Sequence, residues 1–271
     1  LGHDLGHVPY GHIGERFLNE ISLKHNEGYF NHNVQSVRNL MVIENNGEGL
    51  NLSVQVLDGI LCHNGELELQ EYRPKKKTTD DFLNDYNNCY NVPKYVKTLV
   101  PMTLEGCVVR LSDIIAYLGR DIEDAEKLGL FNKKDIPKEI SDVLGTTNRE
   151  IINAIITNVV QNSLDKDYIC VDDKIFNAIV NLKKFNYENI YDKIYTNKEL
   201  DEIKHKFEYL FDNLLISLKE KDLNSKIYSK FYLPMNNDYK NNTSNERVVI
   251  DYIAGMTDEY FLNEYKHYEL R

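Results

Sequence analysis

Apolar residues recur at helical spacing along most of the chain. In residues 33–45, 149–162 and 202–219 they return every three or four positions, which is the period of a helix with one buried face. Residues 108–125 place five apolar side chains on one side of a helical wheel: Leu111, Ile114, Ile115, Leu118 and Ile122. No convincing set of alternating strands, no glycine-rich phosphate loop and no internal repeat accompanies these patterns. The sequence therefore predicts an all-α protein.

Polar, turn-rich stretches separate the predicted helices. We expect residues 72–94 to form an exposed excursion between core helices, and residues 234–246 to form a loop before a final helical segment. Neither stretch has the composition of a linker between independent domains. The organisation expected is one helical domain over residues 1–271, with a core in 1–130 and a C-terminal helical part in 131–271.

Composition and charge narrow the class of protein. With 271 residues, 42% of them hydrophobic, the chain can bury a sizeable core. The net charge of −11 argues against a nucleic-acid surface, and the one basic cluster, Lys75–Lys77, is interpreted as a solvated loop. No apolar run approaches the roughly 18 residues of a membrane helix, and no signal-peptide pattern is present, so a cytoplasmic protein is expected. The scattered cysteines are interpreted as reduced structural thiols: Cys62, Cys89, Cys107 and Cys170.

The opening segment HDLGHVPYGHIGE, residues 3–15, concentrates titratable side chains. They are His3, Asp4, His7, His12 and Glu15. Imidazole and carboxylate together suit divalent metals, and the glycines between them predict a sharp turn before a helix that begins near His12. On that helix His12 and Glu15 share a face. The alternative is a helix-turn-helix with incidental surface histidines, but five such groups interleaved with glycines favour a metal and phosphate site.

Two further polar faces are weaker signals. Opposite its apolar side, the helix of residues 108–125 carries Asp113, Tyr117, Arg120, Asp121 and Asp124. In residues 31–41 another shared face carries His32, Gln35, Ser36 and Asn39. Each pattern taken alone is also typical of an ordinary amphipathic helix with a solvated polar side.

Taken together, five segments resemble the HD-domain superfamily of metal-dependent phosphohydrolases. They are HDLGHVPYGHIGE (3–15), YFNHNVQSVRNL (29–40), GLNLSVQVLDGIL (49–61), LSDIIAYLGRDIEDA (111–125) and DYIAGMTDEY (251–260). The nearest match is the deoxynucleoside triphosphate triphosphohydrolase branch, the dGTPase-like enzymes. This resemblance implies an HD-domain helical fold with additional C-terminal helices.

The resemblance also implies roles for individual residues. Those implied as ligands of one divalent metal ion (Mn, Mg, Fe, Ni or Zn) are His3, Asp4 and Asp113. Those implied at the scissile phosphate are His7, His12, Glu15 and His32, with His12 and Glu15 as the acid/base pair. Those implied for substrate binding are Tyr117 against the deoxyribose, Asp121 at its 3′-hydroxyl and Arg120 on the same face. The family's first metal-ligating histidine lies upstream of the His-Asp pair, and this chain begins after that point.

The implied reaction is metal-dependent hydrolysis of a deoxynucleoside triphosphate to a deoxynucleoside and tripolyphosphate. Two alternatives remain: another HD-type nucleotide phosphohydrolase, and a nucleotide-sensing protein that binds without catalysis. The expected partners are the dNTP substrate and further copies of the chain in a homo-oligomer. Neither a membrane nor a nucleic acid is expected as a partner.

Overall fold

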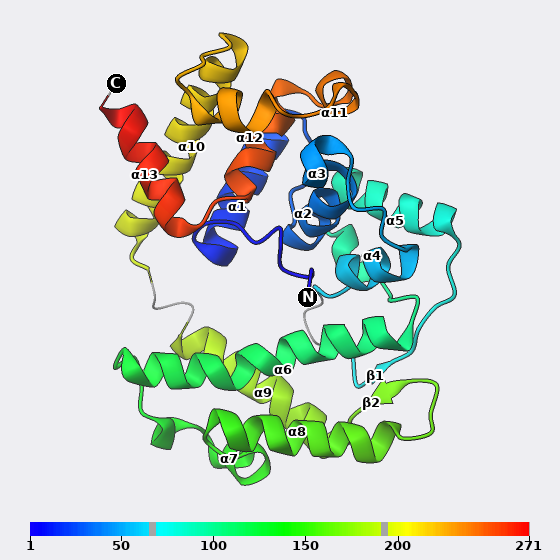
Figure 1. Ribbon diagram of the computed structural model, residues 1–271. Helices are drawn as coiled ribbons and strands as arrows, with labels where there is room; N and C mark the ends of the chain where they lie inside the picture. Colours follow the sequence, from blue (N-terminus) through cyan, green and yellow to red (C-terminus); the bar gives the residue numbers. More distant parts are fainter. Residues whose placement is uncertain (65–68, 191–194, 271) are drawn as a thin grey trace. The chain divides into compact units, whose positions relative to one another are not determined.

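The fold is helical almost throughout. The computed structural model describes residues 1–64, 69–190 and 195–270. Within these ranges the β-structure is one antiparallel pair of two-residue strands, β1 (Glu71–Tyr72) and β2 (Ile169–Cys170), in which Glu71 lies opposite Cys170. Figure 1 shows the helices. The prediction of an all-α protein is confirmed.

Contacts between residues divide the chain into two compact units. The first unit contains residues 1–61, 78–98 and 197–271, and the second contains residues 62–77 and 99–196. Neither unit has a boundary at residue 130, where the sequence suggested the end of a core. The single-domain organisation stays a prediction.

The first unit combines helices from the N-terminal and the C-terminal parts of the chain. In Figure 1 the first helix, in blue, lies beside helices in orange and red. Helix α10 packs against α1, α12 and α13, while α4 packs against α2 and α5. The unit's elements are α1 (Gly11–Lys24), α2 (His32–Arg38), the π-helical segment Asn39–Ile43, α3 (Glu44–Gly47), α4 (Val54–Leu61), α5 (Thr79–Asn91), the 3-10 turn Tyr95–Thr98, α10 (Asn197–Lys219), the π-helical segment Ile227–Tyr232, α11 (Asn237–Asn242), α12 (Asn245–Ala254) and α13 (Asp258–Glu269).

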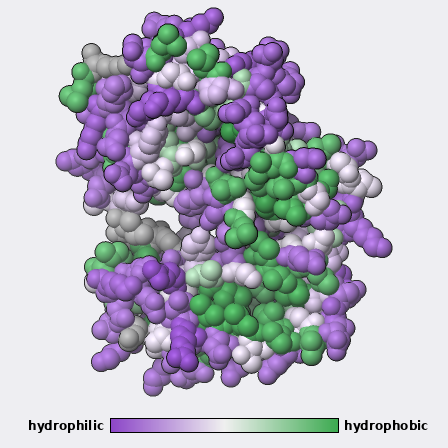
Figure 2. All heavy atoms as spheres, in the orientation of Figure 1, coloured by the Kyte–Doolittle hydropathy of each residue, from purple (hydrophilic) through white to green (hydrophobic). Residues whose placement is uncertain are grey.

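The second unit is built around one long helix. Its elements are α6 (Leu104–Lys127), the 3-10 turn Lys133–Asp135, α7 (Lys138–Leu144), α8 (Asn148–Ser163), α9 (Asp173–Asn189) and the two strands. Helices α8 and α9 both contact α6, which buries the side that the sequence predicted to be apolar: Leu111, Ile115, Leu118 and Ile122. Helix α8 buries Ile151 and Ile155 but leaves Val160 exposed, and Figure 2 shows hydrophobic side chains on the visible face of this unit, in the lower part of the view.

Two predicted loops contain helices. Most of the predicted excursion 72–94 is α5, whose residues Phe82, Tyr86 and Cys89 are buried at helical spacing. The predicted loop 234–246 contains α11 and the start of α12. Both predictions are wrong for the same reason: asparagine, serine and threonine serve here as N-caps rather than as loop residues. The side chains of Thr78, Asn236 and Ser244 each accept a hydrogen bond from the first turn of a helix.

A buried carboxylate joins α2 to the C-terminal helices. Asp251 of α12 accepts two hydrogen bonds from the Arg38 guanidinium, at 2.7 and 2.8 Å, and one from the Tyr239 hydroxyl at 2.9 Å. The Gln35 amide donates a fourth at 3.1 Å. Burial lowers the pKa of Arg38, but the Asp251 carboxylate outweighs burial and holds that pKa above its ordinary value. The ion pair therefore persists at neutral pH and fixes α2 against α12.

Removing this carboxylate should destabilise the protein strongly. Asp251→Ala leaves the Arg38 guanidinium buried without a counter-charge, so we expect the free energy of unfolding to fall by about 3–5 kcal/mol. Urea unfolding followed by circular dichroism measures this change. The matched control is Asp212→Ala on the exposed side of α10, which should change the free energy of unfolding by less than about 0.5 kcal/mol. Equal effects of the two substitutions would show that the ion pair adds nothing.

Candidate active site

The site begins with an unusual start to α1. Tyr10 and Gly11 both have positive φ, 61° and 57°, and no side chain caps the helix. The left-handed conformation costs a non-glycine residue about 1–2 kcal/mol. The backbone N–H of Tyr10 donates to the Asp258 carboxylate at 2.9 Å, which offsets part of that cost. The sharp turn predicted before His12 is thereby confirmed, and its shape depends on a residue of α13.

The His-Asp pair lies on a turn rather than on a helix. The N–H of His7 bonds to the carbonyl of Asp4 at 3.0 Å and closes the turn. Gly6 lies directly against α2, because a Cβ there would stand 2.3 Å from the carbonyl oxygen of His32 and 2.4 Å from the nitrogen of Ser36. Only glycine fits this approach, which brings His3 and Asp4 to the start of α2.

Glu15 connects α1 to α2. Its carboxylate accepts the backbone N–H of His32 at 2.9 Å and lies 3.1 Å from His32 Nδ1 through both oxygens. His12 Nδ1 lies 3.6 Å from the same carboxylate. Burial raises the pKa of Glu15, but the hydrogen bonds from His12 and His32 outweigh burial and hold the pKa well below its ordinary value. Glu15 is therefore ionised at neutral pH and orients both imidazoles.

Three imidazoles surround this carboxylate. The ring centroids of His7, His12 and His32 are 6.0 to 6.4 Å apart. Burial lowers the pKa of His7, and the neighbouring His32 and His12 act in the same direction, so the neutral form dominates at pH 7. His32 is buried, with Nε2 4.0 Å from Asp4, whereas the His12 side chain is 79% exposed. The predicted phosphate-site residues are thus brought together within one unit, where His7 and His12 are exposed and His32 is buried.

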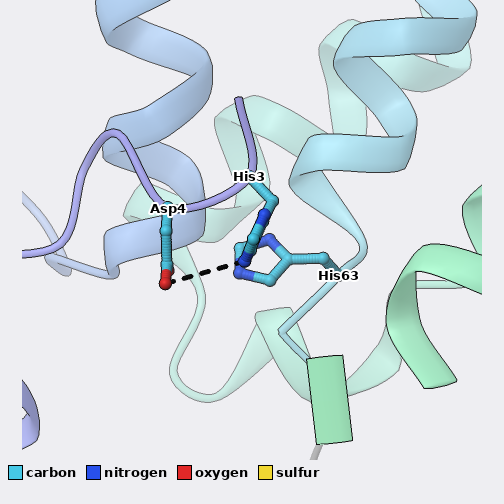
Figure 3. A group of neighbouring side chains, drawn as sticks. All are labelled: His3, Asp4 and His63. Carbon is cyan, nitrogen blue, oxygen red and sulfur yellow. Dashed lines mark ion pairs between the residues drawn. The ribbon is translucent and has the colours of Figure 1, made fainter. Parts of the chain in front are cut away.

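The described part of the chain contains one group of side chains that could hold a metal ion. The candidate ligand atoms of His3, Asp4 and His63 all lie within 4.8 Å of one another. Figure 3 shows the three side chains converging, with His3 Nε2 3.6 Å from Asp4 Oδ2. Two imidazoles and a carboxylate are a donor set that fits a divalent transition metal.

His63 was not expected from the sequence. It is the second residue after α4, and the similarity quoted for residues 49–61 ends just before it. The signal in the sequence is a histidine placed directly after an apolar helix. The structure shows that this histidine is fully buried, and a buried polar side chain usually has a specific role.

The other predicted site residues lie on α6, in the second unit. Asp113 and Asp121 are half-buried, whereas Tyr117 and Arg120 are exposed. The Arg120 guanidinium pairs with Asp124 at 3.0 Å. The assembly of Asp113 with His3 and Asp4 into one ligand set stays a prediction, as do the substrate roles of Tyr117, Arg120 and Asp121.

Several known proteins that are similar to this chain over almost its whole length have the same name. The deoxyguanosinetriphosphate triphosphohydrolase-like protein of Clostridium perfringens (strain SM101 / Type A) is 36% identical over 98% of this chain and 66% of its own length. Proteins of the same name from Desulfatibacillum aliphaticivorans and Rickettsia bellii are 32% and 30% identical over 98% of the chain, and over 68% and 73% of their own lengths. The phosphohydrolase-associated domain family matches residues 169–267.

Fold, site and similarity together define a helical phosphohydrolase-like protein of the HD type. The chain belongs to the deoxyguanosinetriphosphate triphosphohydrolase-like family. It spans about two thirds of the length of the curated relatives it matches, 65–66% for the first four. No helix in residues 1–64, 69–190 or 195–270 has the length and hydropathy needed to cross a membrane.

The lowered pKa of Glu15 predicts a pH-dependent contribution to stability. Because the folded pKa lies below the ordinary value of 4.5, this contribution is complete above about pH 4.5 and is lost as the pH falls towards the folded pKa. We expect Glu15→Gln to lower the free energy of unfolding by about 2 kcal/mol at pH 7, and by clearly less at pH 3. Urea unfolding at both pH values measures the two differences. Glu220→Gln, at an exposed position of the same unit, is the control. A loss that is equal at both pH values would contradict the hydrogen-bonded, ionised Glu15.

Proposed function

We propose that this protein hydrolyses deoxynucleoside triphosphates in a metal-dependent reaction that releases a deoxynucleoside and tripolyphosphate. One observation carries the proposal: His7, His12, His32 and Glu15 form one cluster, in which His32 Nε2 lies 4.0 Å from Asp4 of the His3–Asp4 turn. A carboxylate that orients histidines beside candidate metal ligands is suited to phosphoryl transfer. The name of the relatives supports the same class of reaction.

The metal would be held by His3 and Asp4, with His63 as a further candidate ligand. Asp113 is proposed as the distal carboxylate ligand on the basis of the family resemblance. A divalent ion bound there would supply polarisation of a phosphoryl oxygen and activation of a water molecule.

His12, oriented by Glu15, would supply the proton that the reaction needs. Attack of water on the α-phosphorus breaks its bond to the 5′ oxygen of the sugar, and the leaving oxygen then needs a proton. His12 is the group best suited to donate it, because its side chain is exposed while Nδ1 faces Glu15. The Glu15 carboxylate would stabilise the protonated His12 and hold the ring in place. In this role Glu15 orients the acid and carries no proton itself.

The imidazoles of His7 and His32 would bind phosphate oxygens. The neutral form of His7 offers one N–H as a hydrogen-bond donor rather than a full positive charge. His32 is held by Glu15 through Nδ1, which directs its Nε2 towards Asp4. Donors fixed in this way stabilise charge that develops on the phosphate without reorganising during the reaction.

The substrate's sugar would be bound from α6. Tyr117 is proposed to contact the deoxyribose face, Asp121 its 3′-hydroxyl and Arg120 the neighbouring polar atoms. Homo-oligomerisation is likewise proposed from the family resemblance, and a cytoplasmic location is proposed from the sequence.

The products of the reaction test this proposal directly. We expect the purified protein, incubated with each of the four dNTPs and Mn²⁺ or Mg²⁺, to release tripolyphosphate and a deoxynucleoside in equal amounts. Phosphorus NMR and ion chromatography distinguish the phosphate products. Orthophosphate or pyrophosphate as the main product would favour a different nucleotide phosphohydrolase. Saturable dNTP binding without any product would favour a nucleotide-sensing protein.

The role of Glu15 can be separated from metal binding. We expect Glu15→Gln to lower kcat by about 10²–10⁴-fold at pH 7, because His12 loses the carboxylate that orients it. The dissociation constant for Mn²⁺, measured by calorimetric titration, should change little, since Glu15 is not among the candidate ligands. Wild-type turnover in this variant would remove Glu15 from the mechanism.

A further inference from the structure

The turn that carries His3 and Asp4 is bound by side chains that follow His32. The Ser36 hydroxyl oxygen accepts the backbone N–H of Gly6 at 2.8 Å and lies 2.6 Å from the carbonyl oxygen of His3. Three residues further along, the Asn39 amide donates to the carbonyl of Leu5 at 2.8 Å. Two side chains therefore hold three backbone groups of the turn.

The hydroxyl proton of Ser36 has two possible acceptors. The His3 carbonyl lies at 2.6 Å and the carbonyl of His32, within the same helix, lies at 2.9 Å. The shorter distance favours the bond to His3, which links the turn to α2. Ser36 is fully buried, so loss of its hydroxyl leaves the Gly6 N–H without this acceptor and with little access to water.

Close packing makes these bonds specific. A Cβ at Gly6 would stand 2.4 Å from the nitrogen of Ser36, so the turn lies directly on the backbone of α2. A helix that approaches this closely leaves no layer of side chains or solvent between itself and the turn. The orientation of the His3–Asp4 turn is then set by where Ser36 and Asn39 place their polar atoms.

Hydrogen bonds to α12 hold the segment that carries Ser36 and Asn39. Gln35 donates to the Asn39 amide oxygen and to Asp251, each at 3.1 Å. Asp251 in turn accepts both hydrogen bonds of the Arg38 guanidinium. A continuous set of hydrogen bonds therefore runs from α12 to the carbonyl of Leu5.

We propose that Ser36 is a positioning residue that holds the His3–Asp4 turn in its metal-binding conformation before any metal binds. This rests on the proposed function insofar as His3 and Asp4 are taken as metal ligands. Ser36 does not contact the metal itself; it acts through the backbone of His3 and Gly6. Residues that orient metal ligands in this way commonly change metal affinity by about 10–100-fold when they are substituted. Asn39 supports the same turn from the next position on this face.

The test compares two serines of equal burial. Ser36→Ala removes the hydroxyl that bonds to the backbone of His3 and Gly6. Ser22→Ala is the matched control, because Ser22 is also fully buried and lies in the same unit. Its hydroxyl donates to the carbonyl of Gly28 at 2.7 Å. Hydrogen exchange, followed by mass spectrometry on metal-free protein, reports the turn through a peptide that covers residues 3–8. Calorimetric titration then gives the dissociation constant for Mn²⁺. Urea unfolding shows whether the two variants lose similar stability.

We expect faster exchange in residues 3–8 for Ser36→Ala only, and a Mn²⁺ dissociation constant raised by about tenfold or more relative to Ser22→Ala. Asn39→Ala, which lies at a less buried position, should show the same two effects and serves if Ser36→Ala fails to fold. Unchanged exchange in residues 3–8, or equal loss of Mn²⁺ affinity in the two serine variants, would overturn the proposal. If the wild type binds no divalent metal, the proposed function fails, and the exchange measurement still decides whether Ser36 holds the turn.

Discussion

The bond between Glu15 and His32 is the constraint on which the candidate site depends. One carboxylate of α1 accepts both the backbone N–H and the ring nitrogen of the first residue of α2. This fixes the two helices relative to each other and fixes the ring of His32 at the same time. His12 joins from the same helix as Glu15, and Asp4 faces the other nitrogen of His32. This one interaction therefore joins α1 to α2 and leaves the second ring nitrogen of His32 beside Asp4.

Two carboxylates of the C-terminal helices hold α1 and α2 in place. Asp251 holds α2 through Arg38 and Gln35, and Asp258 holds the start of α1 through the N–H of Tyr10. Neither carboxylate belongs to the predicted site, yet each supports one of the two helices that form it. This gives a physical reason for the presence of the segment DYIAGMTDEY in the same unit as the opening segment. Asp251 and Asp258 of this segment therefore have structural roles, each holding one of the two helices.

The sequence predicts local features better than contacts over long separations. The apolar side of α6 follows from spacing alone, because Leu111, Ile115 and Leu118 must share one face of any helix. The grouping of His12 with Glu15 is local in the same way. In contrast, the bonds from Gln35 to Asp251 and from Tyr10 to Asp258 span 216 and 248 positions, and nothing in the local pattern indicates them. Helix α5 was not predicted because its many asparagines and aspartates are typical of loops. Its three buried residues, Phe82, Tyr86 and Cys89, nevertheless have helical spacing.

The dependence of Tyr10 on Asp258 has a consequence for the order in which the protein is made. At ribosomal rates of about 5–20 residues per second, the 248 positions between them correspond to roughly 10–50 s of synthesis. During that time the second unit's long segment, residues 99–196, has already emerged and has its folding partners at hand. Until Asp258 has been made, the backbone N–H of Tyr10 lacks the acceptor that supports its left-handed conformation. The turn that begins α1 therefore gains this support only after most of the residues of both units have been synthesised.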